Sequence, residues 1–168
     1  MADFETAYSL TIRSEGGYVL TNDPRDTGKQ TYAGISRKFN PQWIGWHSID
    51  RGDTPDTNSV REFYRKAFWN RVNGDSITTQ DVANNIYDFA VNAGVKTAIK
   101  LAQIVVGVQP DGVIGPKSMA ALNSIDGQVF KMAYALAKIA RYRDIVQKNK
   151  SQRAFLLGWI NRSLDGVA

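Results

Sequence analysis

The residues Glu-Gly-Gly-Tyr-Val at positions 15–19 decide the fold, because the hydrophobic period of the chain changes there. Before them, aromatic and aliphatic residues from Phe4 to Ile12 recur at intervals of four, which is the spacing of one helix face. After them, residues 18–21 and 30–33 are short β-like stretches separated by turn-forming residues. We therefore predict an N-terminal helix that ends at the paired glycines and leads into a small irregular β-hairpin.

Helical patterns return after residues 40–56, a stretch with two prolines and two glycines that we predict to be a surface connection. Further helices are expected at residues 58–68, 79–93, 96–106, 117–123, 126–148 and 151–160. In the longest of them, the residues expected to face the core are Val129, Met132, Ala133, Leu136 and Ala140. The sequence thus predicts a mainly α fold with one small β-hairpin near the N-terminus, built around one shared core.

The composition of the 168-residue chain excludes several classes of protein and of site. Hydrophobic residues make up 43% and charged residues 22%, which is typical of a folded globular protein. The chain has no cysteine, so disulfides and thiolate metal ligands are absent. His47 is the single histidine, which argues against a histidine triad or a multi-histidine metal centre. We expect no metal ion and no cofactor.

The net charge of +5 predicts attraction to polyanions. Nucleic acid, anionic lipid headgroups and bacterial wall polymers all have the required charge. The basic residues are spread along the chain without a run of four, so a nucleic-acid partner is disfavoured.

The sequence also bears on where the protein acts. Residues 1–13 contain two acidic side chains and no apolar run of seven, so they do not resemble a secretory signal. No stretch approaches the roughly 20 apolar residues that a membrane span requires. We expect a monomer that is made in the cytoplasm without a signal peptide, does not insert stably into a membrane, and needs separate delivery to a substrate outside.

Glu15 stands where a glycosidase needs a proton donor. In the last turn of a helix, the negative end of the dipole and the unpaired carbonyls disfavour an ionised carboxylate. A carboxyl group that keeps its proton is what a general acid requires. The two glycines that follow lack side chains and allow a sugar to approach closely. The residues alone leave open whether Glu15 is this acid or a solvated acid at a helix end.

Glycoside hydrolysis also needs a second carboxylate, which serves as base or nucleophile. Asp23 and Asp26 lie in the predicted hairpin, from which one of them could return over Glu15. Asn-Asp-Pro at residues 22–24 is a turn initiator, so either carboxylate could instead hold a turn by local hydrogen bonds. A carbohydrate site is the first hypothesis from the residues, with a structural role for these acids as the alternative.

Three segments together resemble the N-terminal signature of the glycoside hydrolase family 108 muramidases. They are residues 15–19, Asn-Asp-Pro-Arg-Asp at 22–26, and Thr-Tyr-Ala-Gly-Ile-Ser at 31–36. Two later segments, residues 87–94 and 111–117, resemble the peptidoglycan-binding half of the same proteins. The motifs occur in the expected order along most of the chain, which makes the resemblance specific.

The resemblance implies a lysozyme-like fold with a muramidase catalytic region at residues 1–75 and a helical peptidoglycan-binding region at residues 76–168. It implies hydrolysis of the β-1,4 bond between N-acetylmuramic acid and N-acetylglucosamine in peptidoglycan glycan strands. The setting would be phage-type lysis or secretion-linked wall remodelling. Glu15 matches the essential acid of the family.

By the same resemblance, Asp26 is expected to be the second carboxylate, in preference to Asp23. Leu20 and Thr21 look like a two-residue insertion relative to the family pattern, which alters the spacing of Asp26 from Glu15. Thr31 is expected to orient a water on the opposite face of the sugar, which predicts inversion at the anomeric carbon.

Four aromatic side chains are candidates to stack on sugar rings. Tyr18 and Tyr32 flank the expected acid in the hairpin, whereas Tyr64 and Trp69 belong to the helical segment after the predicted connection. The alternative is a packing role, because most aromatic residues at helical spacing lie in a core.

Asp88 and Asn92 lie four residues apart on one helix face, where together they could hold an N-acetyl group or a stem-peptide amide. The alternative is a hydrogen-bond network between helices.

Three classes of function fit parts of the sequence. They are a muramidase, a non-catalytic peptidoglycan-binding module and a basic nucleic-acid binder. Glu15 at a helix end favours the first over the second, and the scattered basic residues disfavour the third. The sequence predicts a muramidase.

Overall fold

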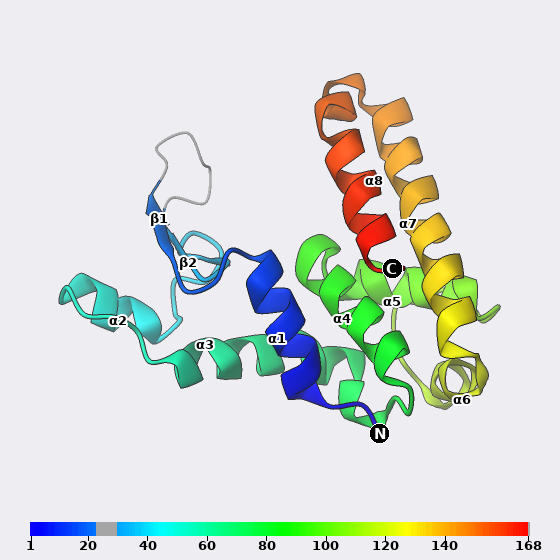
Figure 1. The fold of residues 1–168 in the computed structure, drawn as a ribbon, viewed down its shortest axis with the longest axis horizontal. Helices are drawn as coiled ribbons and strands as arrows, with labels where there is room; N and C mark the ends of the chain where they lie inside the picture. Colours follow the sequence, from blue (N-terminus) through cyan, green and yellow to red (C-terminus); the bar gives the residue numbers. More distant parts are fainter. Residues whose placement is uncertain (23–29, 168) are drawn as a thin grey trace. The chain divides into compact units, whose positions relative to one another are not determined.

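Figure 1 shows the computed structural model, which describes residues 1–22 and 30–167. Within this part of the chain, eight α-helices and one small antiparallel sheet make up most of the regular structure. The predicted fold class is confirmed: the fold is mainly α with a small β element near the N-terminus. The chain divides into two compact units, and each is described separately.

The N-terminal unit spans Phe4–Arg71 and carries the sheet. Its elements are α1 (Phe4–Ser14), β1 (Leu20–Asn22), β2 (Gln30–Tyr32), β3 (Ile35–Ser36), α2 (Gly45–Asp50), α3 (Thr57–Tyr64), the π-helical turn η1 (Arg65–Trp69) and the start of η2 (Asn70–Val72). β2 is the central strand, with Thr21 of β1 opposite Thr31 and Ile35 of β3 opposite Tyr32. The third strand was not predicted, because two residues are too few to show an alternating pattern.

The predicted surface connection at residues 40–56 is wrong in part, because it contains α2. Two buried tryptophans fix this segment despite its prolines and glycines. The indole nitrogen of Trp46 donates to the carbonyl of Asn40 at 2.8 Å, and that of Trp43 donates to the carbonyl of Ser59 at 3.2 Å. Burial of large aromatic side chains therefore outweighs the local turn propensity.

An aromatic cluster forms the core between α1 and α3–η1. The ring centroids of Phe4 and Trp69 are 5.6 Å apart, and those of Tyr8 and Tyr64 are 5.7 Å apart. All four side chains are buried. The i, i+4 spacing that predicted α1 thus predicts its buried face as well.

The C-terminal unit comprises Met1–Asp3 and Val72–Ala168. Its elements are η3 (Gly74–Ser76), α4 (Gln80–Ala93), α5 (Val95–Val105), α6 (Pro116–Ser124), α7 (Gly127–Lys148), η4 (Lys150–Phe155) and α8 (Leu156–Asp165). Within it α7 and α8 run side by side and antiparallel, joined by η4 (Figure 1). In the described residues, no helix combines the length and the apolar character needed to cross a membrane.

The predicted inward face of α7 is wrong. Val129, Met132 and Leu136 are at least half exposed, whereas the buried positions are Phe130, Tyr134, Ala135 and Lys138. The buried positions lie one or two residues away from the predicted ones. The reason is that the rings of Phe130 and Tyr134 pack inward and stack with their centroids 5.0 Å apart. The long stem of a lysine also serves in a core contact, a role that a hydrophobic pattern does not show.

Gln103 of α5 organises the loop at residues 108–115, which precedes α6. Its amide nitrogen donates to the carboxylate of Asp111 at 2.8 Å, the carbonyl of Val113 at 3.0 Å and the hydroxyl of Ser118 at 3.0 Å. Its amide oxygen accepts from the backbone N–H of Gly112 at 2.9 Å. The bond from Gln103 also lowers the pKa of Asp111. One buried amide therefore satisfies groups that span the whole turn.

We expect Gln103→Leu to lower the free energy of unfolding by about 2–3 kcal/mol, because the substitution removes four hydrogen bonds of a buried amide and leaves the buried Ser118 hydroxyl without this partner. Urea unfolding followed by circular dichroism measures the change. Gln109→Leu, at an exposed position of the same loop, serves as the control and should have a small effect. Equal stability of the two variants would contradict the assigned role.

Candidate active site

Glu15 lies immediately after α1, where the chain reverses direction. The N–H of Glu15 still donates to the carbonyl of Thr11 at 2.9 Å. Gly16 and Gly17, with φ of +86° and +75°, then end the helix: the N–H of Gly17 donates to Ile12 at 2.9 Å and that of Gly16 to Arg13 at 3.1 Å. This paired bonding is the Schellman type of helix end, which needs the left-handed conformation at its first glycine. The predicted helix end at the glycine pair is confirmed.

The turn between β2 and β3 lies directly against the Glu15 side chain. A methyl group on Gly34 would lie 3.0 Å from the Glu15 Oε2 and 3.3 Å from its Cβ. The same position is 2.5 Å from the hydroxyl oxygen of Tyr64. The Glu15 carboxylate, the Gly34 backbone and the Tyr64 phenol are therefore neighbours, and only a residue without a side chain leaves room for all three.

Tyr64 contacts the β2–β3 turn from the end of α3. It is the last residue of α3, and its side chain is 1% exposed. Its hydroxyl donates to the carbonyl of Ala33 at 2.9 Å. Three elements that are distant in sequence thus meet at Glu15: the end of α1, the β2–β3 turn and the end of α3. We call Glu15, Ala33, Gly34 and Tyr64 the Glu15 cluster.

Tyr18 lies close to this cluster in sequence and is accessible. Its ring is 42% exposed, and its hydroxyl is 2.9 Å from that of Tyr8. Burial and this hydrogen bond raise the pKa of Tyr8, so its phenol stays neutral at physiological pH. This hydrogen bond holds the Tyr18 hydroxyl and leaves part of the residue exposed to solvent. A contact between Tyr18 and a sugar is compatible with this geometry and stays a prediction.

The other three predicted aromatic contacts have little exposed surface. Tyr32 is 4% exposed and stacks on Trp43 at 5.9 Å, and burial raises its pKa. Tyr64 and Trp69 are buried in the aromatic cluster described above. As these three side chains lie, no ring face is open to a sugar, because packing within the unit covers them.

Of the residues expected to act with Glu15, the structure describes Thr31 but neither aspartate. Thr31 stands at the centre of β2 and is partly exposed, and its carbonyl accepts from the Thr21 hydroxyl at 3.4 Å. Asp23 and Asp26 lie outside the described residues. The water-orienting role of Thr31 and the pairing of Asp26 with Glu15 therefore stay predictions.

Asp88 and Asn92 belong to the other unit, on α4. The carboxylate of Asp88 pairs with Arg162 of α8 at 3.3 Å, and the amide of Asn92 donates to the Asp88 carbonyl at 2.9 Å. Burial lowers the pKa of nearby Lys138, and the negative charge of Asp88 partly offsets this effect. Asp88 thus takes part in a charged network that joins α4, α7 and α8, and its contact with substrate stays a prediction.

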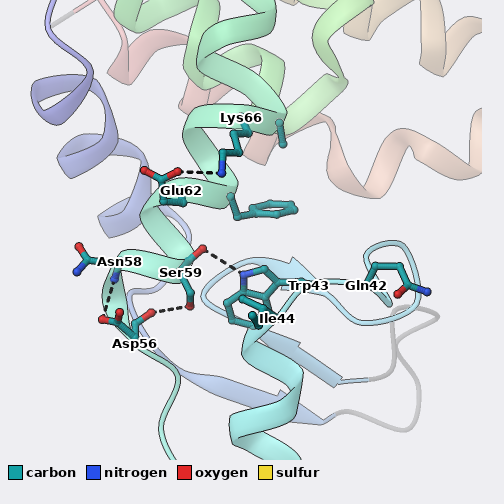
Figure 2. Close-up of a pocket in the computed structure, with 10 residues that line it drawn as sticks. Gln42, Trp43, Ile44, Asp56, Asn58, Ser59, Glu62 and Lys66 are labelled. Carbon is teal, nitrogen blue, oxygen red and sulfur yellow. Dashed lines mark hydrogen bonds and ion pairs between the residues drawn. The ribbon is translucent and has the colours of Figure 1, made fainter.

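A groove of about 680 Å³ also lies in the N-terminal unit, between the segment before α2 and the helix formed by α3 and η1 (Figure 2). It is lined by Gln42, Trp43, Ile44, Asp56, Asn58, Ser59, Glu62, Phe63, Lys66 and Ala67. Figure 2 shows Glu62 and Lys66 joined as an ion pair on the α3 side, at 3.1 Å. No predicted site residue lines the groove, so we assign it no part in the reaction.

Ala33 and Gly34 were not predicted as site residues, and Tyr64 was predicted in another role, as a sugar-stacking ring. Gly34 has a local signal, because Ala-Gly between two strand-like residues is a turn signal. The role of the Tyr64 hydroxyl has no such signal, since its partner is 31 residues away. Among the described residues, no group of three or more His, Asp or Glu side chains is arranged to hold a metal ion.

Comparisons with known proteins identify two matching family models and a similar solved structure. Residues 8–94, which include Glu15 and Tyr64, match the family model described as Glycosyl hydrolase 108. Residues 97–164 match the model described as Predicted Peptidoglycan domain. A solved structure of Brucella abortus SagA is 26% identical to the chain, with a TM-score of 0.66, over 98% of this chain and 95% of that chain. None of the curated proteins matches the chain.

We expect Gly34→Ala to destabilise the protein more than Gly52→Ala does. Both glycines have a positive φ, of +77° and +82°, but a methyl group on Gly52 meets nothing within 4 Å. Backbone strain of about 1–2 kcal/mol is common to the two variants. The crowding at Glu15 and Tyr64 should add about 1–3 kcal/mol in Gly34→Ala alone. Urea unfolding compares them, and equal losses would contradict the close packing of the cluster.

Proposed function

Because the chain belongs to the glycosyl hydrolase 108 family, we propose that it is an N-acetylmuramidase. It is a glycoside hydrolase with a peptidoglycan-binding half, and peptidoglycan is its substrate. The bond that we propose it cleaves is the β-1,4 bond between N-acetylmuramic acid and N-acetylglucosamine. The observation that carries the proposal is the Glu15 carboxyl group, held after α1 against the β2–β3 turn within the matched family region.

In the proposed mechanism Glu15 is the general acid. Its carboxyl group donates a proton to the oxygen of the scissile glycosidic bond as that bond breaks, so the leaving sugar departs as a neutral alcohol. Gly34 lies beside this carboxyl group, and we expect its backbone to limit the positions that the group can take. A fixed donor is favourable because the proton must be aligned with one oxygen in the transition state.

The second half of the mechanism concerns the anomeric carbon. Asp26 acts as the general base, takes a proton from a water molecule held by Thr31, and so directs the water to the face opposite the leaving group. This arrangement gives inversion, and it requires the two carboxyl groups to be about 6.5–9.5 Å apart. Tyr18, which has ring surface open beside this region of the sequence, supplies a sugar-stacking contact.

The alternative is a peptidoglycan-binding module without catalysis, which the match at residues 97–164 alone would fit. We expect Glu15→Gln to lower the rate of peptidoglycan hydrolysis by about 10²–10⁴-fold, since the amide keeps the size of the side chain but has no acidic proton. Loss of turbidity of a peptidoglycan suspension measures the rate, and a pull-down with the same suspension measures binding. Binding should be retained.

Glu5→Gln is the matched control, because Glu5 lies on the same helix and pairs with Arg61. It should hydrolyse peptidoglycan at nearly the rate of the unaltered protein. Full activity of Glu15→Gln would refute the proposed mechanism, and absence of hydrolysis by the unaltered protein would favour the binding module.

We propose that the positive charge holds the enzyme on the anionic wall. Although basic residues occur along the whole chain, one group of them lies in the C-terminal unit, at the end of α7 and in η4. It comprises Arg141, Arg143, Lys148, Lys150 and Arg153. The last three of these side chains are exposed, and the single acid in the segment, Asp144, pairs with Arg143 at 2.8 Å. We call this segment the basic tip.

We expect the triple variant Lys148→Glu, Lys150→Glu, Arg153→Glu to adsorb more weakly to intact walls. Adsorption should also fall as salt is raised, because exposed charges are screened over about 10 Å at 0.1 M ionic strength. Cosedimentation with purified walls across a salt series measures both effects. Hydrolysis of soluble uncharged oligosaccharides should change little.

The control for this variant is Lys96→Glu, Lys100→Glu, Lys117→Glu, which changes the net charge equally at exposed positions of the same unit. If both triple variants lose adsorption to the same extent, the basic tip has no special role. If neither loses it, electrostatic attraction does not hold the enzyme on the wall.

The site of action follows from the substrate. We propose that the protein acts in the periplasm or cell wall, reached through a membrane lesion or a dedicated export route. The two biological settings that fit are phage-type lysis and secretion-linked wall remodelling.

A further inference from the structure

We infer that Tyr64 is a positioning residue for the catalytic acid, acting on Glu15 through the β2–β3 turn. The inference rests on the proposed function of Glu15. It assigns to a buried phenol a role in the rate of the chemical step, beyond its packing in the aromatic cluster.

The turn is held in a conformation that its sequence does not favour. Ala33 has a φ of 49°, in the left-handed region that residues with a side chain seldom adopt. For alanine this conformation is unfavourable, because the Cβ atom lies too close to the following carbonyl oxygen. Such strain persists only where the surroundings impose it, and it is concentrated at functional sites. The strained residue here is adjacent to Gly34, where a methyl group would meet the Glu15 carboxylate.

Two hydrogen bonds hold Ala33 in place. Its N–H donates to the carbonyl of Val19 at 3.1 Å, and its carbonyl accepts from the Tyr64 hydroxyl at 2.9 Å. The first bond comes from the chain just before β1. The second comes from α3, so it ties the turn to the helical core of the unit.

The Tyr64 hydroxyl is itself fixed by the packing of its ring. Tyr8 packs on it at 5.7 Å between centroids, Phe63 at 5.6 Å and Phe68 at 5.8 Å. With 1% of the side chain exposed, water cannot readily replace the phenol as a donor to Ala33. Loss of the hydroxyl therefore leaves a buried carbonyl without this partner and removes the force that offsets the strain at Ala33.

The consequence for catalysis follows from geometry. Once the Ala33 carbonyl is released, the turn can relax out of the left-handed region, and Gly34 moves with it. The Glu15 carboxyl group then loses its support and samples positions away from the glycosidic oxygen. A misplacement of about 1 Å costs about 10²-fold in rate, whereas binding of the glycan chain elsewhere on the protein is unaffected.

The test is steady-state kinetics on soluble peptidoglycan glycan oligosaccharides. We expect Tyr64→Phe to lower kcat by about 10–100-fold with KM changed less than about twofold, because the ring stays in place and only the positioning is lost. Circular dichroism and urea unfolding establish that the variant is folded under the assay conditions.

The matched control is Tyr134→Phe. Tyr134 is also a fully buried tyrosine, and its hydroxyl donates to the backbone carbonyl of Ala98 at 3.0 Å, but it lies in the C-terminal unit. Each substitution removes one buried phenol–carbonyl hydrogen bond, so the two variants should lose similar stability. Only Tyr64→Phe should lose kcat.

The double variant Tyr64→Phe, Ala33→Gly provides a rescue. Glycine adopts the left-handed conformation without the penalty that alanine has, so the turn keeps its shape without the Tyr64 bond. We expect kcat to recover several-fold relative to Tyr64→Phe. A structural role of Tyr64 through stability alone predicts no such recovery of kcat in protein that is already folded.

The outcomes separate the two claims. If Glu15→Gln is inactive and Tyr64→Phe has an unchanged kcat, the positioning role is refuted and the proposed function stands. If Tyr64→Phe raises KM instead, or Tyr134→Phe lowers kcat equally, or Ala33→Gly gives no recovery, the positioning role is also refuted. If Glu15→Gln is fully active, the proposed function itself fails.

Discussion

The close approach of the Gly34 backbone to the Glu15 carboxylate is the constraint on which the site depends. It requires a glycine at that position, a left-handed turn between β2 and β3, and a helix that ends at residue 15. The glycine pair after Glu15 meets the last requirement and the Tyr64 hydroxyl secures the second. The Glu15 carboxyl group thus lies beside the β2–β3 turn and close to the buried phenol of Tyr64.

The two units contribute in different ways to one function. The N-terminal unit holds the acid, the sheet and the aromatic cluster, and it lies almost wholly within the region that matches the glycoside hydrolase family. In the C-terminal unit, residues 72–94 still belong to the glycoside hydrolase match and residues 97–164 match a peptidoglycan-binding family. This unit also carries the basic tip and is organised by polar contacts such as those of the buried Gln103. We propose that chemistry and attachment to the wall belong to different parts of the chain.

Local signals predicted the parts of the fold that local physics controls. The glycine pair after Glu15 marked the end of α1, and Asp126 marked the start of α7, where its carboxylate accepts from two backbone N–H groups. Long-range packing decided the rest. The indoles of Trp43 and Trp46 stabilise α2 in a stretch whose prolines and glycines indicated a loop, and stacked rings of α7 turned its buried face away from the predicted one.

The candidate site was predictable to the same degree. Glu15 stands out by its position at a helix end beside glycines, whereas Tyr64 has no signal that separates a core tyrosine from one that orients a turn. Trp69, which was expected to contact sugar, is buried in the core. Large aromatic side chains are more often buried in a core than exposed to a ligand.

Identification of the sugar at the newly formed reducing end tests the central claim most directly. Purified peptidoglycan is digested with the protein and with Glu15→Gln, the products are reduced with borohydride, and mass spectrometry identifies the reduced sugar. If Glu15 is the general acid of an N-acetylmuramidase, the unaltered protein gives N-acetylmuramitol and Glu15→Gln gives no reduced product above background. N-acetylglucosaminitol, or equal amounts of product from both proteins, would contradict it.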